Sequence, residues 1–299
     1  MSSDAGLGRA AHLIVNADDF GYFDSVSKGI LDCARAGVVT ATGIMANGPA
    51  FDRCVGKLGE IPTLSAGVHL NATLGRPLTD AMRNELPSGH GEFPSKLELA
   101  GWLLRGRVTV ATLLEEWRAQ IRRCLDAGLE LHFLNSHEHV HILPPLYRGI
   151  FELAREFGIA HVRVPRPEWG PSWTAGGVFR SGVFAAVRLI LPPSPAHAPV
   201  FIGLDSSGKL DMRYCRRRFG KLRAGTTYEL MCHPGWKDPV ALEDPKLAAY
   251  HDWELELRTL TSPEFAALLR EHGIALVSYA NLPLRTTGPT GSVASGRDT

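Results

Sequence analysis

The sequence has no marked excess of charge of either sign. Its 299 residues include 32 basic and 31 acidic side chains, which gives a formal net charge of +1. Proteins that bind nucleic acid or another polyanion usually carry a clear positive excess. The charge balance therefore argues against a nucleic-acid partner.

Long apolar runs and paired cysteines are lacking as well. No stretch approaches the ~20 apolar residues of a transmembrane helix, and the N-terminus MSSDAGLGRAAHLIV does not have the layout of a signal peptide. An odd number of cysteines without CxxC spacing is typical of buried thiols in a reducing compartment. We therefore expect a cytoplasmic protein. The five cysteines are Cys33, Cys54, Cys124, Cys215 and Cys232.

Apolar residues are plentiful and form an alternating pattern of strands and helices. They make up 44% of the chain, enough for a large core in one α/β barrel or in two smaller domains. Alternation of this kind predicts a parallel sheet. The expected strands are 12–16, 41–47, 64–70, 132–137, 160–164, 227–233 and 274–278, and the expected helices are 25–36, 51–58, 110–125, 146–157 and 263–272.

One segment interrupts the alternation. Residues 73–107 are Pro, Gly and mixed polar residues, long enough for an insertion over one end of the sheet that could form a lid. The helix that follows has an apolar stripe for core packing, and Glu116 is among the charged residues expected to face away from the core. The C-terminal segment 285–299 is rich in Gly, Thr and Ser and is expected to be disordered. The stripe is Val110, Leu114, Trp117, Ile121 and Leu125.

Two adjacent carboxylates follow the first strand. Asp18 and Asp19 belong to the motif NADDFG, at the carboxyl end of that strand, where parallel α/β folds place their active sites. A turn in which aspartate favours the bend explains the motif equally well. The pair alone is suggestive and not specific.

Histidines end three further strands. GVHLN (67–71) ends the third expected strand and contains His69, and a single histidine at such a position is more often structural. In SHEHVH, His137, His139 and His141 share one face if the strand continues, which favours metal binding because three imidazoles on one face must be solvated, paired or metal-bound. His233 precedes a Pro-Gly turn in MCHPG, which a plain strand-to-turn junction also explains. Since each motif follows its own strand, one pocket would collect all of them.

Together these motifs resemble the YdjC-like carbohydrate deacetylase family. The likeness runs from VNADDFG through VTATGIMANGPAF, GVHLN and SHEHVH to ELMCHPG and GIALVSY. It implies a distorted (β/α) barrel with a mostly parallel sheet, formed by residues 1–284 as a single domain with loop insertions. It also implies one divalent metal ion, bound by Asp19, His69 and His137.

Amide hydrolysis agrees with this set of residues. A metal with an open position activates water and polarises the acetyl carbonyl. Asp18 is then free to accept the proton of the water, and His233 is the best-placed acid to protonate the leaving amine. The metal could be zinc, which suits imidazole ligands, or magnesium, which the resemblance admits. The sequence departs from the family pattern at Asn135, a position where the family often has aspartate.

The residues that bind substrate are harder to identify from the sequence. His139 and His141 could orient ligands or touch substrate. Arg163 could hold Asp18 or a substrate oxygen. The tryptophans of the site region, Trp169, Trp173 and Trp236, could stack on sugar rings or anchor loops.

The expected activity is removal of the acetyl group from an N-acetylated sugar, as an N-acetylglucosamine-type oligosaccharide or glycolipid. A metal hydrolase of another amide or ester, or a sugar-binding relative without turnover, is the alternative. The sequence leaves open whether the protein forms a homo-oligomer.

Overall fold

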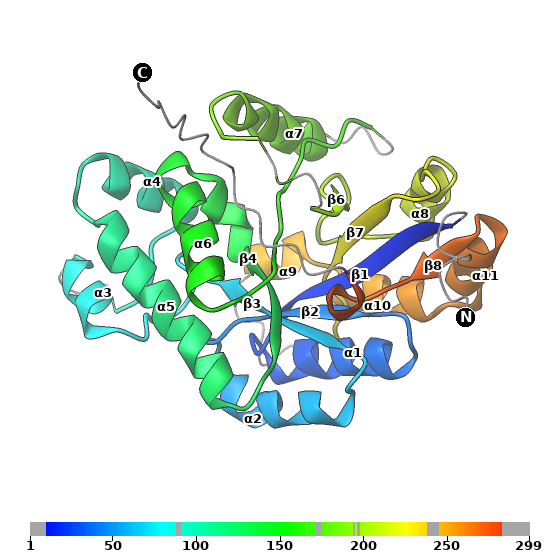
Figure 1. Ribbon diagram of the computed structural model, residues 1–299, viewed down its shortest axis with the longest axis horizontal. Coiled ribbons are helices and arrows are strands. Elements are labelled where there is room, and N and C mark those ends of the chain that lie inside the picture. The colour runs from blue at the N-terminus through cyan, green and yellow to red at the C-terminus, as the bar shows by residue number, and fades with distance from the viewer. Residues whose placement is uncertain are drawn as a thin grey trace, which may run out of the picture.

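The eight strands of the described residues lie in one sheet, in which every pair is parallel. The computed structural model describes residues 10–87, 91–170, 175–193, 195, 198–237 and 245–282. The strand order is β5-β4-β3-β2-β1-β7-β6, with β8 also paired to β1. Within the described residues β5 and β6 do not pair, so the sheet is a curled, incompletely closed barrel (Figure 1). The predicted distorted barrel with a parallel sheet is confirmed.

The strands are β1 (Ala11–Phe20), β2 (Ala41–Ile44), β3 (Ser65–Leu70), β4 (Leu131–Ser136), β5 (His161–Val162), β6 (Val200–Ile202), β7 (Thr227–Cys232) and β8 (Ile274–Leu276). The helices are α1 (Asp24–Arg35), α2 (Phe51–Cys54), α3 (Asp80–Glu85), α4 (Lys96–Leu104), α5 (Val110–Asp126), α6 (Pro144–Glu156), α7 (Ala175–Arg188), α8 (Met212–Phe219), α9 (Pro245–Tyr250), α10 (Trp253–Thr261) and α11 (Pro263–Glu271). The described part of the chain also has three 3₁₀ segments, η1 (Val55–Glu60), η2 (His137–Ile142) and η3 (Tyr279–Asn281).

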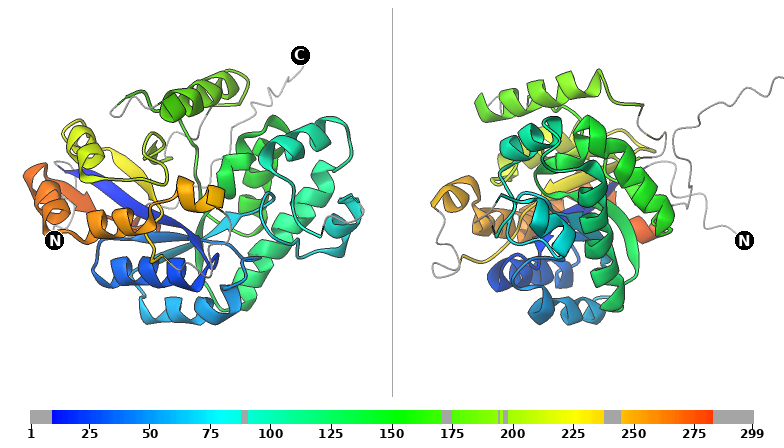
Figure 2. Two further views of the ribbon diagram at one scale, coloured as in Figure 1. Left: turned by 180° about the vertical axis from the view of Figure 1, so that it is seen from behind. Right: turned by 90° about the vertical axis from the view of Figure 1, so that its left-hand side faces the viewer.

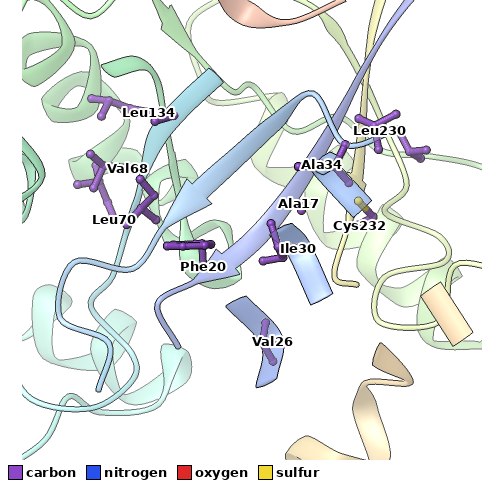
Figure 3. Close-up of a cluster of buried hydrophobic side chains, with 14 of the residues drawn as sticks. Ala17, Phe20, Val26, Ile30, Ala34, Val68, Leu70, Leu134, Leu230 and Cys232 are labelled. Atoms are coloured by element: carbon purple, nitrogen blue, oxygen red, sulfur yellow. The ribbon is translucent and has the colours of Figure 1, made fainter. Parts of the chain in front are cut away.

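β1 is the centre of the sheet and the core. It pairs with β7 along residues 12–17, with β8 along 11–13, and with β2 from Asn16 onward. A strand that is buried on both faces has a near-continuous run of apolar residues, and β1 contains such a run in HLIV. Helix α1 covers one face, and Figure 3 shows its side chains against those of β1 and its neighbours. The labelled residues are Ala17, Phe20, Val26, Ile30, Ala34, Val68, Leu70, Leu134, Leu230 and Cys232.

The insertion at 73–107 contains helices α3 and α4, where the sequence indicated no regular structure. Glu116 of α5 anchors this insertion, since its carboxylate accepts hydrogen bonds from the backbone N–H groups of Leu78 and Thr79 at 2.9 and 2.8 Å. The expectation that Glu116 faces away from the core is wrong, because these bonds satisfy its buried charge. Leu125, expected in the buried stripe, is 39% exposed. Closure of the insertion as a lid stays a prediction.

In the described part of the chain, none of the helices combines the length and the apolar content that crossing a membrane requires. Segment 285–299 and Trp173 lie outside the described residues.

Candidate metal centre

Three side chains from the ends of β1, β3 and β4 converge at one edge of the sheet. Asp19 lies near the end of β1, His69 near the end of β3, and His137 directly after β4. Their ligand atoms all lie within 4.8 Å of one another. Asp19 Oδ1 is 3.3 Å from His69 Nε2 and 3.2 Å from His137 Nδ1. The sequence predicted this group, and two imidazoles with one carboxylate are a suitable donor set for a divalent transition metal.

The backbone of β1 is irregular where the two aspartates lie. Neighbouring side chains on a strand point to opposite faces, which would separate Asp18 from Asp19. Here the register of β1 against β2 shifts between Ala17 and Phe20, and Asp19 has a left-handed φ of 72°. Both carboxylates therefore approach the ring of His69, Asp18 at 3.8 Å from Nδ1 and Asp19 at 3.3 Å from Nε2.

Asn135 orients His69. Its Nδ2 donates to Asp18 Oδ1 at 2.9 Å, so its Oδ1 is the acceptor that lies 2.8 Å from His69 Nδ1. This arrangement assigns the proton of His69 to Nδ1 and leaves the Nε2 lone pair for a metal. An amide thus supplies the acceptor that an aspartate would supply. Gly43 leaves space for it, since a Cβ there would lie 3.2 Å from Asn135 Oδ1.

We expect Asn135→Ala to weaken metal binding by about 10- to 100-fold, because His69 loses the acceptor that fixes its orientation. Metal titration followed by calorimetry measures the change. The matched control is Gln120→Ala, which removes another buried amide, one that bonds Asn71 O at 2.9 Å and lies outside the cluster. Equal metal affinity in the Asn135 variant and the wild type would refute this role.

Asp18 is held by a buried arginine. Arg163 Nη1 and Nη2 donate to Asp18 Oδ2 and Oδ1 at 2.5 and 3.0 Å, and both side chains are fully buried. Burial acts to raise the pKa of Asp18, but the charge and hydrogen bonds of Arg163 outweigh it and lower the pKa. Asp18 is therefore ionised at neutral pH. Of the two roles expected for Arg163, the structure shows the contact with Asp18.

Glu229 is a site residue that the sequence analysis missed. It lies within β7, and its Oε1 accepts from Arg163 Nε at 2.7 Å and from Asn16 Nδ2 at 3.2 Å. Arg163 thus bridges two buried carboxylates. A single carboxylate inside the apolar strand TYELMC was the available signal, because an isolated charge is rarely buried without a partner.

His233 follows β7 and pairs with Glu256 of α10. Glu256 Oε2 accepts the backbone N–H of His233, and Oε1 lies 3.9 Å from His233 Nδ1. Burial acts to lower the pKa of His233, but Glu256 and the charges of Asp19 and Asp18 outweigh it and raise the pKa to about 9. His233 is therefore protonated at neutral pH. Glu256 was also missed, although it lies on the same helix face as Trp253 and Leu260, both buried.

The other two histidines of SHEHVH do not share a face with His137. β4 ends at Ser136, and Glu138 and His139 have left-handed φ angles of 49° and 57° within η2. A shared face was predicted only if the strand continued, and this condition is not met because the chain leaves the extended conformation after Ser136. His141 Nδ1 lies 2.5 Å from Ser136 Oγ, which belongs to the last residue of β4.

His141 Nε2 lies 3.1 Å from the carbonyl oxygen of Arg163. Burial lowers the pKa of His141 to about 3, so the ring is neutral and its Nε2–H donates to that carbonyl, tying η2 to the residue after β5. The ring of His139 lies against Phe184 and Phe201, with centroids 5.5 and 5.4 Å away. Burial lowers the pKa of His139 well below its ordinary value. Substrate contact by either histidine stays a prediction.

The tryptophans have different surroundings. Trp169 is 54% exposed, in the loop after β5. The indole N–H of Trp236 donates to Asp32 at 2.8 Å, and Lys28 Nζ lies 5.0 Å from its ring centroid, so contacts with α1 explain its position. Stacking of Trp169 or Trp236 on a sugar stays a prediction.

Glu168, next to Trp169, fixes that loop. Its carboxylate accepts from the N–H groups of Gly203 and Asp205 at 3.0 and 3.2 Å and from the hydroxyl of Tyr214 at 2.6 Å. These bonds connect the loop to the end of β6 and to α8. The sequence analysis did not identify this residue.

Comparison with known proteins agrees with this geometry. The family model described as YdjC-like protein matches residues 12–271, a span that contains Asp18, Asp19, His69, His137 and His233. The chain belongs to the YdjC-like family. The family that the sequence motifs predicted is thereby confirmed.

Relatives of the YdjC-like chain are similar over nearly their full length. A carbohydrate deacetylase of Geobacillus stearothermophilus is 32% identical over 270 residues, which cover 90% of this chain and 96% of the relative. A chitooligosaccharide deacetylase of Klebsiella pneumoniae is 31% identical over 279 residues, covering 90% and 98%. A solved structure from Enterococcus faecalis, named for cellobiose-phosphate cleavage, has 26% identity and a TM-score of 0.67, covering 91% and 98%.

Proposed function

We propose that this protein is a metal-dependent hydrolase that removes the acetyl group from an N-acetylated sugar. The observation that carries the proposal is that two carboxylates with different surroundings lie on opposite sides of the His69 ring. His69 has the cluster carboxylate Asp19 at Nε2 and the arginine-held carboxylate Asp18 near Nδ1. The protonated His233 is close enough for both aspartates to raise its pKa. The names of the two deacetylase relatives support the sugar substrate.

Asp19, His69 and His137 would hold one divalent metal ion, which when bound activates water and polarises the acetyl carbonyl. The residues suit zinc by donor type, and magnesium is the second candidate. Burial acts to raise the pKa of Asp19, but hydrogen bonds with His137 and His69 lower it well below its ordinary value, so this ligand is ionised. A carboxylate must be ionised to bind a metal.

Asp18 and His233 would move the protons of the reaction. The ionised Asp18 accepts the proton of the attacking water, and Arg163 holds that carboxylate in position. The amine must leave protonated, and His233 supplies that proton. The two groups have opposite protonation states at neutral pH because Arg163 faces one and Glu256 faces the other.

The test is acetate release from a panel of N-acetylglucosamine oligosaccharides and N-acetylated glycolipids, with acetate esters as a second arm. Each is assayed after chelation and after readdition of zinc or magnesium. We expect release from an N-acetylated sugar, loss on chelation and recovery with one metal. Turnover of esters alone would assign a different reaction, and binding without turnover would make the protein a sugar-binding relative.

We place the protein in the cytoplasm on the state of its thiols. All five cysteines are buried and free, and thiols that do not form disulfides suit a reducing compartment.

Glu256 gives a prediction for pH dependence. His233 is an acid only while protonated, so activity falls as pH rises through its pKa, and this basic limb lies at or below about pH 9 because a bound cation adds positive charge. Glu256→Gln removes the negative charge beside His233, so the basic limb moves to lower pH with metal content unchanged. Rate measurements across pH, with metal analysis, test this.

The control for that shift is Glu116→Gln, which neutralises a buried carboxylate in α5 that contacts the insertion instead. Its basic limb should match the wild type. A Glu256→Gln profile superimposable on the wild-type profile would remove Glu256 as the positioning residue of His233.

A further inference from the structure

His251 is a buried histidine that the proposed reaction does not use. It lies between α9 and α10 and is 7% exposed. The carbonyl oxygen of Trp253 accepts the backbone N–H of Gly235 at 3.2 Å, and this bond holds the segment against the turn that follows His233. Figure 2 shows the segment, in orange, beside the yellow strand β7. The backbone therefore brings His251 to the candidate site.

The ring of His251 lies against two other rings. Its centroid is 4.9 Å from that of His233, with the two planes 61° apart. It is also 4.9 Å from the ring of Trp253, on which it stacks with the planes 21° apart. Stacking on a buried tryptophan limits the orientations of the imidazole. His251 is therefore held in place next to the acid of the proposed reaction.

The surroundings of His251 keep its ring neutral. Burial and the charge of His233 lower the pKa of His251 to about 3. Asp19 and His137 of the metal cluster also act on this pKa, in opposite directions, so the ring is within electrostatic reach of the cluster. A neutral imidazole has one N–H donor and one acceptor nitrogen, whereas a phosphate favours a cation. His251 therefore suits an uncharged hydroxyl group, which both donates and accepts.

One ring nitrogen of His251 is unused. Its Nδ1 is buried and has no hydrogen-bond partner within the described part of the chain. Buried polar atoms normally have a partner, because leaving one unpaired costs free energy. Nε2 of His12 is unpaired too, but His12 lies at the start of β1, at the other end of that strand from Asp19. His251 differs in lying next to the proposed acid, where a substrate can supply the partner.

We propose that His251 binds a hydroxyl group of the substrate sugar, on a carbon next to the one that bears the acetamido group. The assignment rests on the proposed function, in which His233 protonates the amine nitrogen on that carbon. Since the two rings are 4.9 Å apart, the groups of the sugar within reach of His251 are those attached next to this nitrogen. His251 then selects sugars in which that hydroxyl is free, because a buried polar atom that loses its partner disfavours the analogue.

The experiment measures acetate release from the disaccharide of N-acetylglucosamine and from two analogues, one without the C3 hydroxyls and one without the C1 hydroxyl. We expect kcat/KM of the wild type to be at least about tenfold lower for one analogue, because Nδ1 of His251 then stays unpaired. His251→Phe keeps a ring to stack on Trp253 but has no ring nitrogens. It should raise KM for the disaccharide with kcat and metal content unchanged, and should no longer distinguish the analogue from the disaccharide.

The matched control is His12→Phe, which also removes a buried, unpaired ring nitrogen and should have the kinetic constants of the wild type. His251→Gln, which keeps a donor and an acceptor, should recover part of the discrimination. Wild-type discrimination in His251→Phe, or a loss of kcat or metal without a rise in KM, would overturn the inference and leave the proposed function standing. No acetate release from the disaccharide or any other sugar of the panel would overturn the proposed function, and this inference with it.

Discussion

His137→Ala should lose the divalent metal and the hydrolase activity together. His137 contributes one of three ligand groups, and its Nδ1 lies 3.2 Å from Asp19 Oδ1. With two protein ligands left, metal affinity should fall by far more than the ~10- to 100-fold expected for an orienting residue. Activity should fall to background at micromolar metal. Metal analysis of the purified variant and acetate release measure the two effects on one sample.

The matched control is His139→Ala, a histidine two residues away in the same 3₁₀ segment. Its ring packs against Phe184 and Phe201 and is not part of the cluster. We expect its metal content to equal that of the wild type. A His137→Ala protein that retains full metal but is inactive would move His137 out of the ligand set and make it a group that acts on substrate.

The metal cluster could be predicted because each of its members ends a separate strand. In a parallel sheet these ends meet at one edge, so Asp19, His69 and His137 are neighbours although the chain separates them widely. Sequence periodicity could not reveal the left-handed φ of Asp19, which brings both aspartates to one ring. Single left-handed residues other than glycine are uncommon and depend on the surrounding tertiary structure.

The supporting charges were harder to predict for a different reason. Glu116, Glu229 and Glu256 are all buried, and each is stabilised by partners far away in sequence. A rule that places charged residues on the surface fails at such positions, because it omits the hydrogen bonds that make burial tolerable. Since the apolar pattern is local, it gave seven of the eight strands and five of the eleven α-helices in the described residues. It did not indicate β6 or the helices α3, α4, α7, α8, α9 and α10.

The second large effect is expected for Asp18→Asn, which should retain metal but lose about 10²- to 10⁴-fold in turnover, because an amide cannot accept the proton of the water. The ligand cluster excludes Asp18, so metal content should match the wild type. Asp19→Asn should instead weaken metal binding, because Asp19 belongs to the ligand cluster. Single-turnover acetate release at saturating metal separates the two variants.

Removing Asp18 also removes a partner of Arg163, so a control must reproduce that loss. Glu229→Gln does so, because Glu229 accepts from the same guanidinium at 2.7 Å but is not adjacent to the cluster ligand Asp19. We expect a comparable loss of thermal stability in both variants, with the large fall in turnover confined to Asp18→Asn. Equal turnover losses would mean that the buried charge pair, and not proton transfer, accounts for the effect.

The acidic side of the pH profile shows which group stops activity when it becomes protonated, Asp18 or a histidine ligand. Asp18 acts as a base while ionised, and Arg163 holds its pKa below the ordinary value of 3.8. Its own protonation therefore stops activity only below about pH 4. An acidic limb nearer pH 6 would report protons competing with the metal for the ring nitrogen of His137, because burial acts to lower the pKa of His137 but the hydrogen bond and charge of Asp19 outweigh it and raise that pKa. That limb should move to lower pH as metal concentration rises. A metal-independent limb near pH 6 that Asp18→Asn abolishes would show that Asp18 titrates far above the range its contact with Arg163 allows.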